Sequence, residues 1–166
     1  MPRTTKLRAK TAPRSKTRTP TEIELGPLSS FVGYALRRAQ VAVFEDFYTT
    51  LSELGLRPAQ FSVLMVIHQN AGSKQSEVAR GLGIQTPNFV AIIDALEERG
   101  LVERAQDSRD RRSYSLHLTT KGKTLLSDAR ARQAEHERRM VAKLGERGRD
   151  QLLTLLAKLA TAADEV

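Results

Sequence analysis

The chain has 166 residues, of which 40% are hydrophobic and 28% charged, and it contains no cysteine. This length fits one domain with a sizeable core plus a terminal arm. The lack of cysteine excludes disulfides, thiolate-bound zinc and cysteine-based oxidant sensing. No apolar run approaches the ~18 residues that span a bilayer, and no secretory segment opens the chain. We therefore expect a soluble, cytoplasmic protein.

The positive charge of the chain is concentrated near its amino terminus. Residues 1–20 hold seven of the 27 Lys and Arg side chains and no acid, so the remainder carries 20 basic and 19 acidic side chains. Three prolines and many Ser and Thr residues oppose a stable helix there. We expect residues 1–22 to form a basic disordered arm. Such an arm is either a solvated tail or a segment that lies along DNA phosphates and adds a salt-sensitive attraction.

Two helices are predicted first in the chain. The first covers residues 28–54 and closes at Gly55, and the second starts at Pro58 and ends at residues 70–72 (NAG), which contain a glycine stop signal. The inner face of the first helix is expected to consist of apolar residues at helical spacing: Phe31, Ala35, Ala39, Val43, Phe47 and Leu51.

A helix-turn-helix pattern follows. Residues 74–84 are typical of a short helix that ends in a glycine turn, and Thr86 is expected to cap a second helix, with Pro87 in its first turn. That second helix is expected to stop at Gly100. Its apolar stripe has i, i+3, i+4 and i+7 spacing and comprises Phe89, Ile92, Ile93 and Leu96.

Two strands and two further helices complete the prediction. The strands cover residues 101–105 and 114–118, and an arginine-rich tip at residues 106–113 joins them. Thr119 or Thr120 is expected to cap a helix over residues 121–144, and a last helix covers residues 147–163. The last helix has too much leucine for a helix left in water. Its apolar surface meets either the outer helices of a second copy, as in a two-fold dimer, or its own first helix.

The fold class expected is therefore mainly α with a small β-wing. It is a winged helix-turn-helix in which the terminal helices form a dimerisation lobe. A helix-turn-helix backed by a basic two-stranded wing is suited to gripping duplex DNA.

Five short motifs occur in a fixed order: residues 56–61 (LRPAQF), 75–79 (QSEVA), 96–102 (LEERGLV), 107–112 (DSRDRR) and 118–122 (LTTKG). In this order and at these spacings the chain resembles MarR-type transcriptional regulators over roughly residues 28–163. The resemblance implies one domain over residues 23–163. Its dimerisation helices would cover about residues 28–54 and 121–163, and its winged helix-turn-helix about residues 57–120. It also implies a homodimer whose affinity for a double-stranded DNA operator responds to a small molecule.

The DNA-contacting residues are expected on the second helix of the helix-turn-helix and on the wing. Asn88 can pair with adenine or merely cap the first turn of its helix, and Ala91 can touch a thymine methyl. The family often has Arg or Ser near positions 90 and 91, where this chain has Val and Ala, so groove shape is expected to contribute to specificity. The candidates on the helix-turn-helix are Lys74, Gln75, Ser76, Gln85, Thr86, Pro87, Asn88 and Ala91, with Thr119 or Lys121 as further phosphate contacts.

The wing tip supplies the other candidates. Arg109 matches the family residue that enters the minor groove, and Asp107 would orient it by a charge-assisted hydrogen bond. Arg111 and Arg112 would then face phosphates or brace the wing. The alternative is that the tip is only a solvated loop.

A ligand site is expected around the first helix, where the resemblance places the effector pocket of the family. Aromatic rings beside arginines suit an anionic aromatic ligand. The alternative is that these aromatics form the dimer core and that the arginines pair with acids. The chain resembles the branch of the family that responds to aromatic acids or hydroxycinnamoyl-CoA thioesters. The candidates for ligand contact are Phe31, Tyr34, Arg37, Arg38, Phe44 and Phe61.

No motif of the chain indicates catalysis. The three histidines fall on different predicted elements, and no nucleophile elbow, phosphate loop or metal-ligand spacing is present. We expect no enzyme activity, no cofactor, no metal and no membrane partner. The function predicted is a repressor released from a palindromic operator by a small aromatic acid or aromatic acyl-CoA. The alternative is a non-specific basic DNA-binding dimer without an effector.

The wing gives the first testable prediction. Replacing Arg109 by Ala should weaken specific operator binding by roughly 1–3 kcal/mol, because an arginine in a narrow minor groove gains from its enhanced negative potential. Helix content by circular dichroism and the dimer by sedimentation should not change. An unchanged affinity in an operator titration would remove Arg109 from the groove.

Overall fold

The structure is a computed structural model that describes residues 23–106 and 114–161. It divides into two compact units, Met1–Leu36 and Arg37–Val166. Within the described residues, no helix is both long and apolar enough to cross a membrane.

The first unit contains a short 3-10 helix, η1 (Gly26–Ser30), and the start of α1 (Val32–Leu51). The hydroxyls of Ser29 and Ser30 donate to the carbonyls of Gly26 and Pro27, three residues earlier. Phe31 is extended, with φ −84° and ψ 129°, and separates η1 from α1. The predicted helix over residues 28–54 is therefore wrong at its start, because tight 3-10 turns and one extended residue precede the regular helix.

At the other end of α1 the predicted closure at Gly55 is confirmed, but the last turn before it is a 3-10 turn rather than regular helix. A second 3-10 helix, η2 (Ser52–Leu54), follows α1, and Gly55 then adopts a left-handed conformation with φ 57°. Of the inner face expected for the first helix, only Phe47 and Leu51 are buried, whereas Phe31 is 56% exposed. A single chain thus covers only the carboxyl-terminal end of that face.

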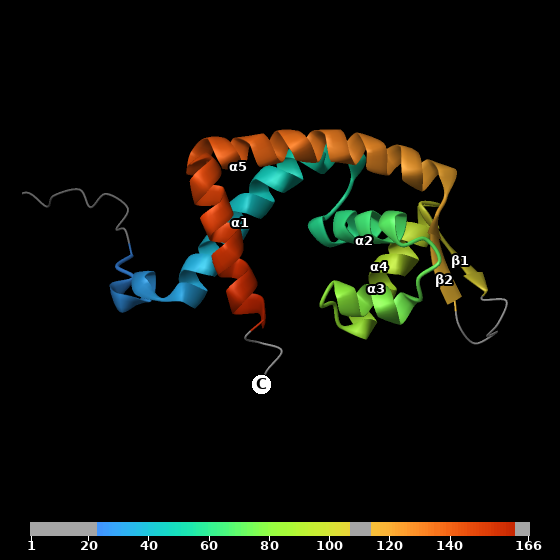
Figure 1. The fold of residues 1–166 in the computed structure, drawn as a ribbon, viewed down its shortest axis with the longest axis horizontal. Helices are drawn as coiled ribbons and strands as arrows, with labels where there is room; N and C mark the ends of the chain where they lie inside the picture. Colours follow the sequence, from blue (N-terminus) through green and yellow to red (C-terminus); the bar gives the residue numbers. More distant parts are fainter. Residues whose placement is uncertain (1–22, 107–113, 162–166) are drawn as a thin grey trace, which may run out of the picture. The chain divides into compact units, whose positions relative to one another are not determined.

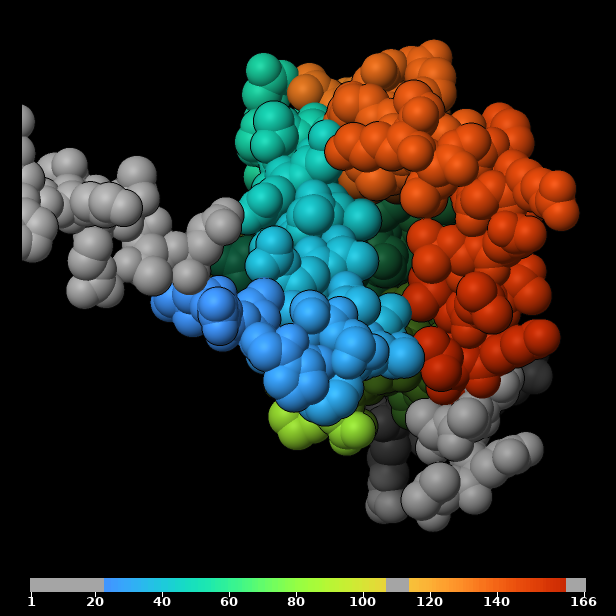
Figure 2. Space-filling view, turned by 90° about the vertical axis from the view of Figure 1, so that its left-hand side faces the viewer, coloured from blue at the N-terminus to red at the C-terminus, as the bar shows by residue number. Residues whose placement is uncertain are grey.

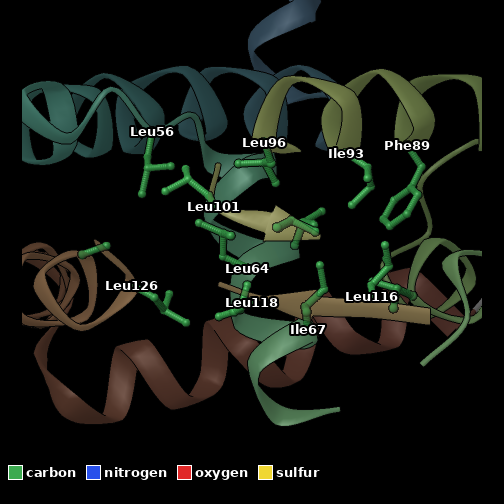
Figure 3. Close-up of a cluster of buried hydrophobic side chains, with 14 of the residues drawn as sticks. Leu56, Leu64, Ile67, Phe89, Ile93, Leu96, Leu101, Leu116, Leu118 and Leu126 are labelled. Atoms are coloured by element: carbon green, nitrogen blue, oxygen red, sulfur yellow. The ribbon is translucent and has the colours of Figure 1, made fainter. Parts of the chain in front are cut away.

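The second unit is built around three further helices: α2 (Pro58–Gln69), α3 (Gln75–Gly81) and α4 (Thr86–Glu98). The start of α2 at Pro58 and its end before Asn70 confirm the prediction for this helix. Figure 3 shows α4 turning Phe89, Ile93 and Leu96 toward side chains of α2, the wing and α5. These three side chains are fully buried, and Ile92 is half-buried at the edge of the same stripe.

The helix-turn-helix boundaries differ slightly from those predicted. The α3 helix ends at Gly81 rather than at residue 84, and Gly83 has a φ of 62° that a regular helix does not allow. In α4 the carbonyl of Gln85 accepts the first helical hydrogen bond, from Phe89 N at 3.0 Å. Gln85 is therefore the cap and Thr86 the first helical residue, so the prediction of a Thr86 cap was wrong by one position.

The wing is an antiparallel pair of β1 (Val102–Gln106) and β2 (Tyr114–Leu118), with Val102 opposite Leu118. Backbone hydrogen bonds of 3.0 Å join Leu116 to Ser73 and to Gly72, so the segment before α3 extends this small sheet. The tip of the wing lies outside the described residues.

The last helix, α5 (Thr120–Thr161), is one long element with a break at Gly145, where φ is 69° and ψ is 158°. Figure 1 shows the helix axis turning sharply between its two halves. This break agrees with the predicted division between residues 144 and 147. The hydroxyl of Thr119 accepts a hydrogen bond from Gly122 N at 3.0 Å, which confirms Thr119 as the cap.

Gly122 gives a second testable prediction, because a Cβ there would lie 2.0 Å from the carbonyl oxygen of Leu101. That oxygen belongs to the backbone and accepts a hydrogen bond from Thr119 N at 3.1 Å, so it has little freedom to move. Replacing Gly122 by Ala should lower the free energy of unfolding by about 3 kcal/mol, in the upper range for overpacking.

The matched control for this change is Gly148→Ala on the same helix. A Cβ at position 148 would meet only Leu144 Cβ at 3.6 Å, which is ordinary contact. This variant should be unchanged or stabilised by up to about 1 kcal/mol through helix propensity. Equal urea-unfolding curves for the two variants would contradict the close approach of Gly122 to Leu101.

Candidate nucleic-acid interface

The amino-terminal end of α4 presents its polar face to solvent. Gln85, Thr86, Pro87, Asn88 and Ala91 are all exposed, as the sequence pattern predicts. The opposite face of the same two turns carries Phe89 and Ile93 into the core, which fixes the rotation of the helix about its axis. Pro87, Asn88 and Ala91 therefore lie on the accessible face opposite the core, and Gln85 and Thr86 are exposed at the first turn, where base or phosphate contact is possible.

A hollow of about 300 Å³ lies beside this face, between α3, α4 and β2. Its floor is apolar, and its walls carry an ammonium, an amide and three hydroxyls. The residues that line it are Lys74, Gln75, Ser76, Ala79, Thr86, Phe89 and Tyr114. The structure thus brings four of the predicted DNA-contacting residues together around one concavity.

Tyr114 is a member of this group that the sequence analysis did not name. It is the first residue of β2, and its side chain is 49% exposed. The signal that could have found it is the alternation of the strand, because Leu116 and Leu118 face the core and Tyr114 shares their side of the strand beyond the core's edge.

Arg104 on β1 ties the wing to both helices of the helix-turn-helix. Its guanidinium donates to Asp94 at 2.5 Å and to Glu97, both on α4, and its Nε donates to Gln75 Oε1 on α3 at 3.3 Å. The side chain is only 21% exposed. Burial opposes its protonation, but the hydrogen bonds and charges of Asp94 and Glu97 outweigh burial and raise the pKa of Arg104. Sequence analysis missed this residue, because its partners lie 7 to 29 positions away.

A second brace holds the carboxyl-terminal end of α4. Arg99 donates to the carbonyls of Leu54 and Gly55, each at 2.8 Å. Lys121 Nζ donates to the carbonyl of Arg99 at 2.7 Å. The hydroxyl of Thr119 donates to the carbonyl of Gly100, also at 2.7 Å. Lys121 and Thr119, which were predicted as possible phosphate contacts, therefore have structural partners within the chain.

Asp107, Arg109, Arg111 and Arg112 lie outside the described residues. The described strands nevertheless fix where the tip begins and ends, at the paired residues Gln106 and Tyr114.

The predicted ligand-contacting residues are divided between the two units. Phe31 and Tyr34 belong to the first unit, and the other four belong to the second. In the second unit Arg37, Arg38 and Phe44 are exposed. Phe61 is half-buried, and its ring packs edge-on against Phe47 at a centroid distance of 5.8 Å.

Beyond these rings lies a polar junction between α1 and α5 that sequence analysis did not find. His136 is 3% exposed, packs against the Phe47 ring at 5.9 Å and places its Nδ1 2.5 Å from Asp46 Oδ2. Arg139 holds the same carboxylate through hydrogen bonds of 2.9 to 3.2 Å and also donates to Thr50. The hydrogen bond from Arg139, aided by His136, holds the pKa of Asp46 below its usual value despite burial.

Arg104 gives a third testable prediction. Replacing it by Gln should lower the free energy of unfolding by about 1–2 kcal/mol, because two acids lose a charged partner in a half-buried site. The free energy of binding to specific duplex DNA should also weaken, even where the variant is fully folded, because Arg104 no longer holds the wing against α4.

The control for Arg104 is Arg132→Gln, which removes one ion pair with Glu53 at 2.7 Å between more exposed side chains. That change should cost at most about 0.5 kcal/mol and leave DNA affinity unaltered. If both variants had the same free energy of unfolding and the same DNA affinity, the ion pairs of Arg104 would contribute no more than an ordinary surface ion pair.

Comparison with known proteins places this architecture in a family. The family model described as MarR family matches residues 54–113. A proposed transcriptional regulatory protein for the hcr operon of Thauera aromatica is 32% identical over 139 residues, which cover 83% of this chain and 84% of that protein.

Solved structures agree with this placement. The transcriptional repressor CouR bound to a 23-mer DNA duplex is 49% identical, with a TM-score of 0.80, over 84% of this chain and 99% of that one. CouR bound to p-coumaroyl-CoA is 48% identical, with a TM-score of 0.78, over 84% of this chain and 98% of that one. On the extent and identity of these matches, the chain belongs to the MarR family of transcriptional regulators.

Proposed function

We propose that this protein is a transcriptional repressor that binds a double-stranded DNA operator as a homodimer. We propose further that an aromatic acid or its CoA thioester releases it. The observation that carries this proposal is the likeness, at 48–49% identity, to CouR structures bound to a DNA duplex and to p-coumaroyl-CoA. The fold and the exposed face of α4 supply the physical means.

For the DNA step, α4 enters the major groove with its exposed amino-terminal turn. Asn88 and Ala91 are its base-facing candidates, and Gln85, Thr86 and Pro87 flank them. Lys74, Gln75 and Ser76 at the start of α3 meet phosphates, which position the protein without reading the sequence. Arg109 at the wing tip reaches the adjacent minor groove, with Asp107 orienting it and Arg111 and Arg112 near phosphates.

For the dimer step, the carboxyl-terminal half of α5 leaves a large apolar surface uncovered. Leu152, Leu153, Leu155 and Leu159 are 41–58% exposed in the single chain, and Figure 2 shows this red segment at the surface. Exposed apolar surface of this extent normally meets a partner. A second copy is the fitting partner, because two linked recognition helices can read two half-sites about one helical turn apart.

For the effector step, we propose contacts from the first helix and from α2. Arg37 or Arg38 would pair with the anionic end of the ligand, while Phe31, Tyr34, Phe44 and Phe61 would pack on its ring. The polar junction of Asp46, His136 and Arg139 stands beside Phe47, the ring that Phe61 contacts. A ligand that moves this aromatic group would therefore also displace side chains at the contact between α1 and α5.

The experiment is an anisotropy titration of the protein on a duplex selected by binding from a random-sequence pool. Adding p-coumaroyl-CoA should release the duplex, whereas CoA alone should release less, since it lacks the aromatic ring. A ligand lowers DNA affinity only through its different affinity for the two states of the protein. Absence of release by p-coumaroyl-CoA and by free aromatic acids would favour a non-specific DNA-binding dimer without an effector.

A fourth testable prediction concerns Arg37 and Arg38 in the same assay. Replacing the arginine that pairs with the ligand by Ala should preserve DNA affinity and abolish release, because the charge partner is gone. Replacement by Lys should restore release only in part, since an ammonium lacks the planar fork of the guanidinium. The control Arg132→Ala should respond like the parent. If both Arg37→Ala and Arg38→Ala do so too, the anionic end binds elsewhere.

A further inference from the structure

We infer that a second cavity, between α2 and the first half of α5, binds the phosphate group of a small molecule. The cavity has a volume of about 360 Å³ and is lined by His68, Lys123, Leu126, Ser127 and Arg130. None of these residues belongs to the DNA-contacting or effector-contacting sets named above.

The spacing of the lining residues brings their polar side chains to the same cavity. Lys123, Ser127 and Arg130 are four and three positions apart on α5, so they lie on one face of that helix. His68 approaches from the last turn of α2, which the first half of α5 passes in Figure 1. Leu126 is 2% exposed and closes the floor.

The chemistry of the lining favours a phosphate. An ammonium, a guanidinium, an imidazole and a hydroxyl can together donate to several oxygens of one dianion. None of the ion pairs between described residues involves Lys123 or Arg130, so within the described part of the chain no carboxylate pairs with these two cations. Asp128 on the same helix is displaced by roughly 100° from Ser127.

The location distinguishes this cavity from the DNA-binding face. Figure 1 shows α2 between α5 and the helix-turn-helix, with α3 and α4 on the far side of α2. The volume falls at the lower end of the range for small organic ligands. A phosphorylated metabolite is thus a better occupant than the backbone of the duplex that α4 contacts.

The test uses the three histidines of the chain as reporters in ring carbon–proton NMR spectra of the full-length protein. Inorganic phosphate is titrated against sodium chloride at constant pH and ionic strength. The His68 signal, identified from its loss in a His68→Gln variant, should shift and saturate, while the buried His136 should not move. In the double variant Lys123→Gln, Arg130→Gln, the apparent affinity should fall about tenfold or more, because two charged donors are lost.

The control Arg132→Gln carries the same kind of change two residues beyond Arg130 and should retain the parent response. Because Lys123 and Arg130 are exposed, the double variant should keep the parent's thermal unfolding curve. A His68 shift that never saturates, or one that saturates equally in the double variant, would overturn the inference. So would a double variant whose DNA affinity and salt dependence fall, since the cavity would then hold a phosphate of the duplex.

Discussion

The structure depends on one hydrophobic cluster that joins the recognition helix to everything that positions it. Phe89, Ile93 and Leu96 of α4 are completely buried against side chains of α2, the wing and α5. Each such side chain contributes about 1.5–3 kcal/mol when removed from water. Because the inner stripe of α4 can be buried in only one rotation, its outer face is also determined. The accessible edge of Asn88 and its neighbours follows from the packing of the opposite side.

Polar contacts then fix the positions of the wing, α3 and α4 relative to one another, which apolar burial alone does not determine. Arg104 joins β1 to α3 and α4, and Arg99 joins the end of α4 to the turn after η2. The close approach of Gly122 to Leu101 places the start of α5 directly against the residue that leads into the wing. These contacts make the wing and the recognition helix a single reading unit, which a repressor needs if base contacts and groove shape are to be read together.

The other half of the second unit is stabilised differently. Asp46, His136 and Arg139 form a hydrogen-bonded junction between α1 and α5, and beyond it the apolar side chains of α5 are mostly exposed. A junction of charged groups holds two helices in one geometry without requiring a large core. The leucines that this chain leaves uncovered are the surface on which we propose that a second copy packs. The helix-turn-helix with its wing and the junction of α1 with α5 are thus held by separate contacts, with α5 common to both.

The sequence by itself determined the elements whose limits follow from local chemistry. Pro58 starts α2, Thr119 or Thr120 caps α5, a break divides α5 between residues 144 and 147, and the stripe of α4 has helical spacing, because caps, turns and periodicity act within a few residues. The winged helix-turn-helix and the exposed face of α4 followed from these signals, whereas the family followed from the resemblance carried by five short motifs. The start of the first helix and the cap of α4 did not, because 3-10 turns and a one-residue shift differ little in local free energy.

Only the tertiary structure decided which polar residues meet. Asp46 and His136 are 90 positions apart, and Arg99 reaches carbonyls 44 and 45 positions away. No spacing rule along the chain connects such pairs, because their approach results from the packing of whole helices. The same holds for Tyr114, which joins Lys74 and Thr86 around one hollow, and for the cavity that His68 shares with α5. Side chains from distant segments converge there because the shared core brings their helices and strands together.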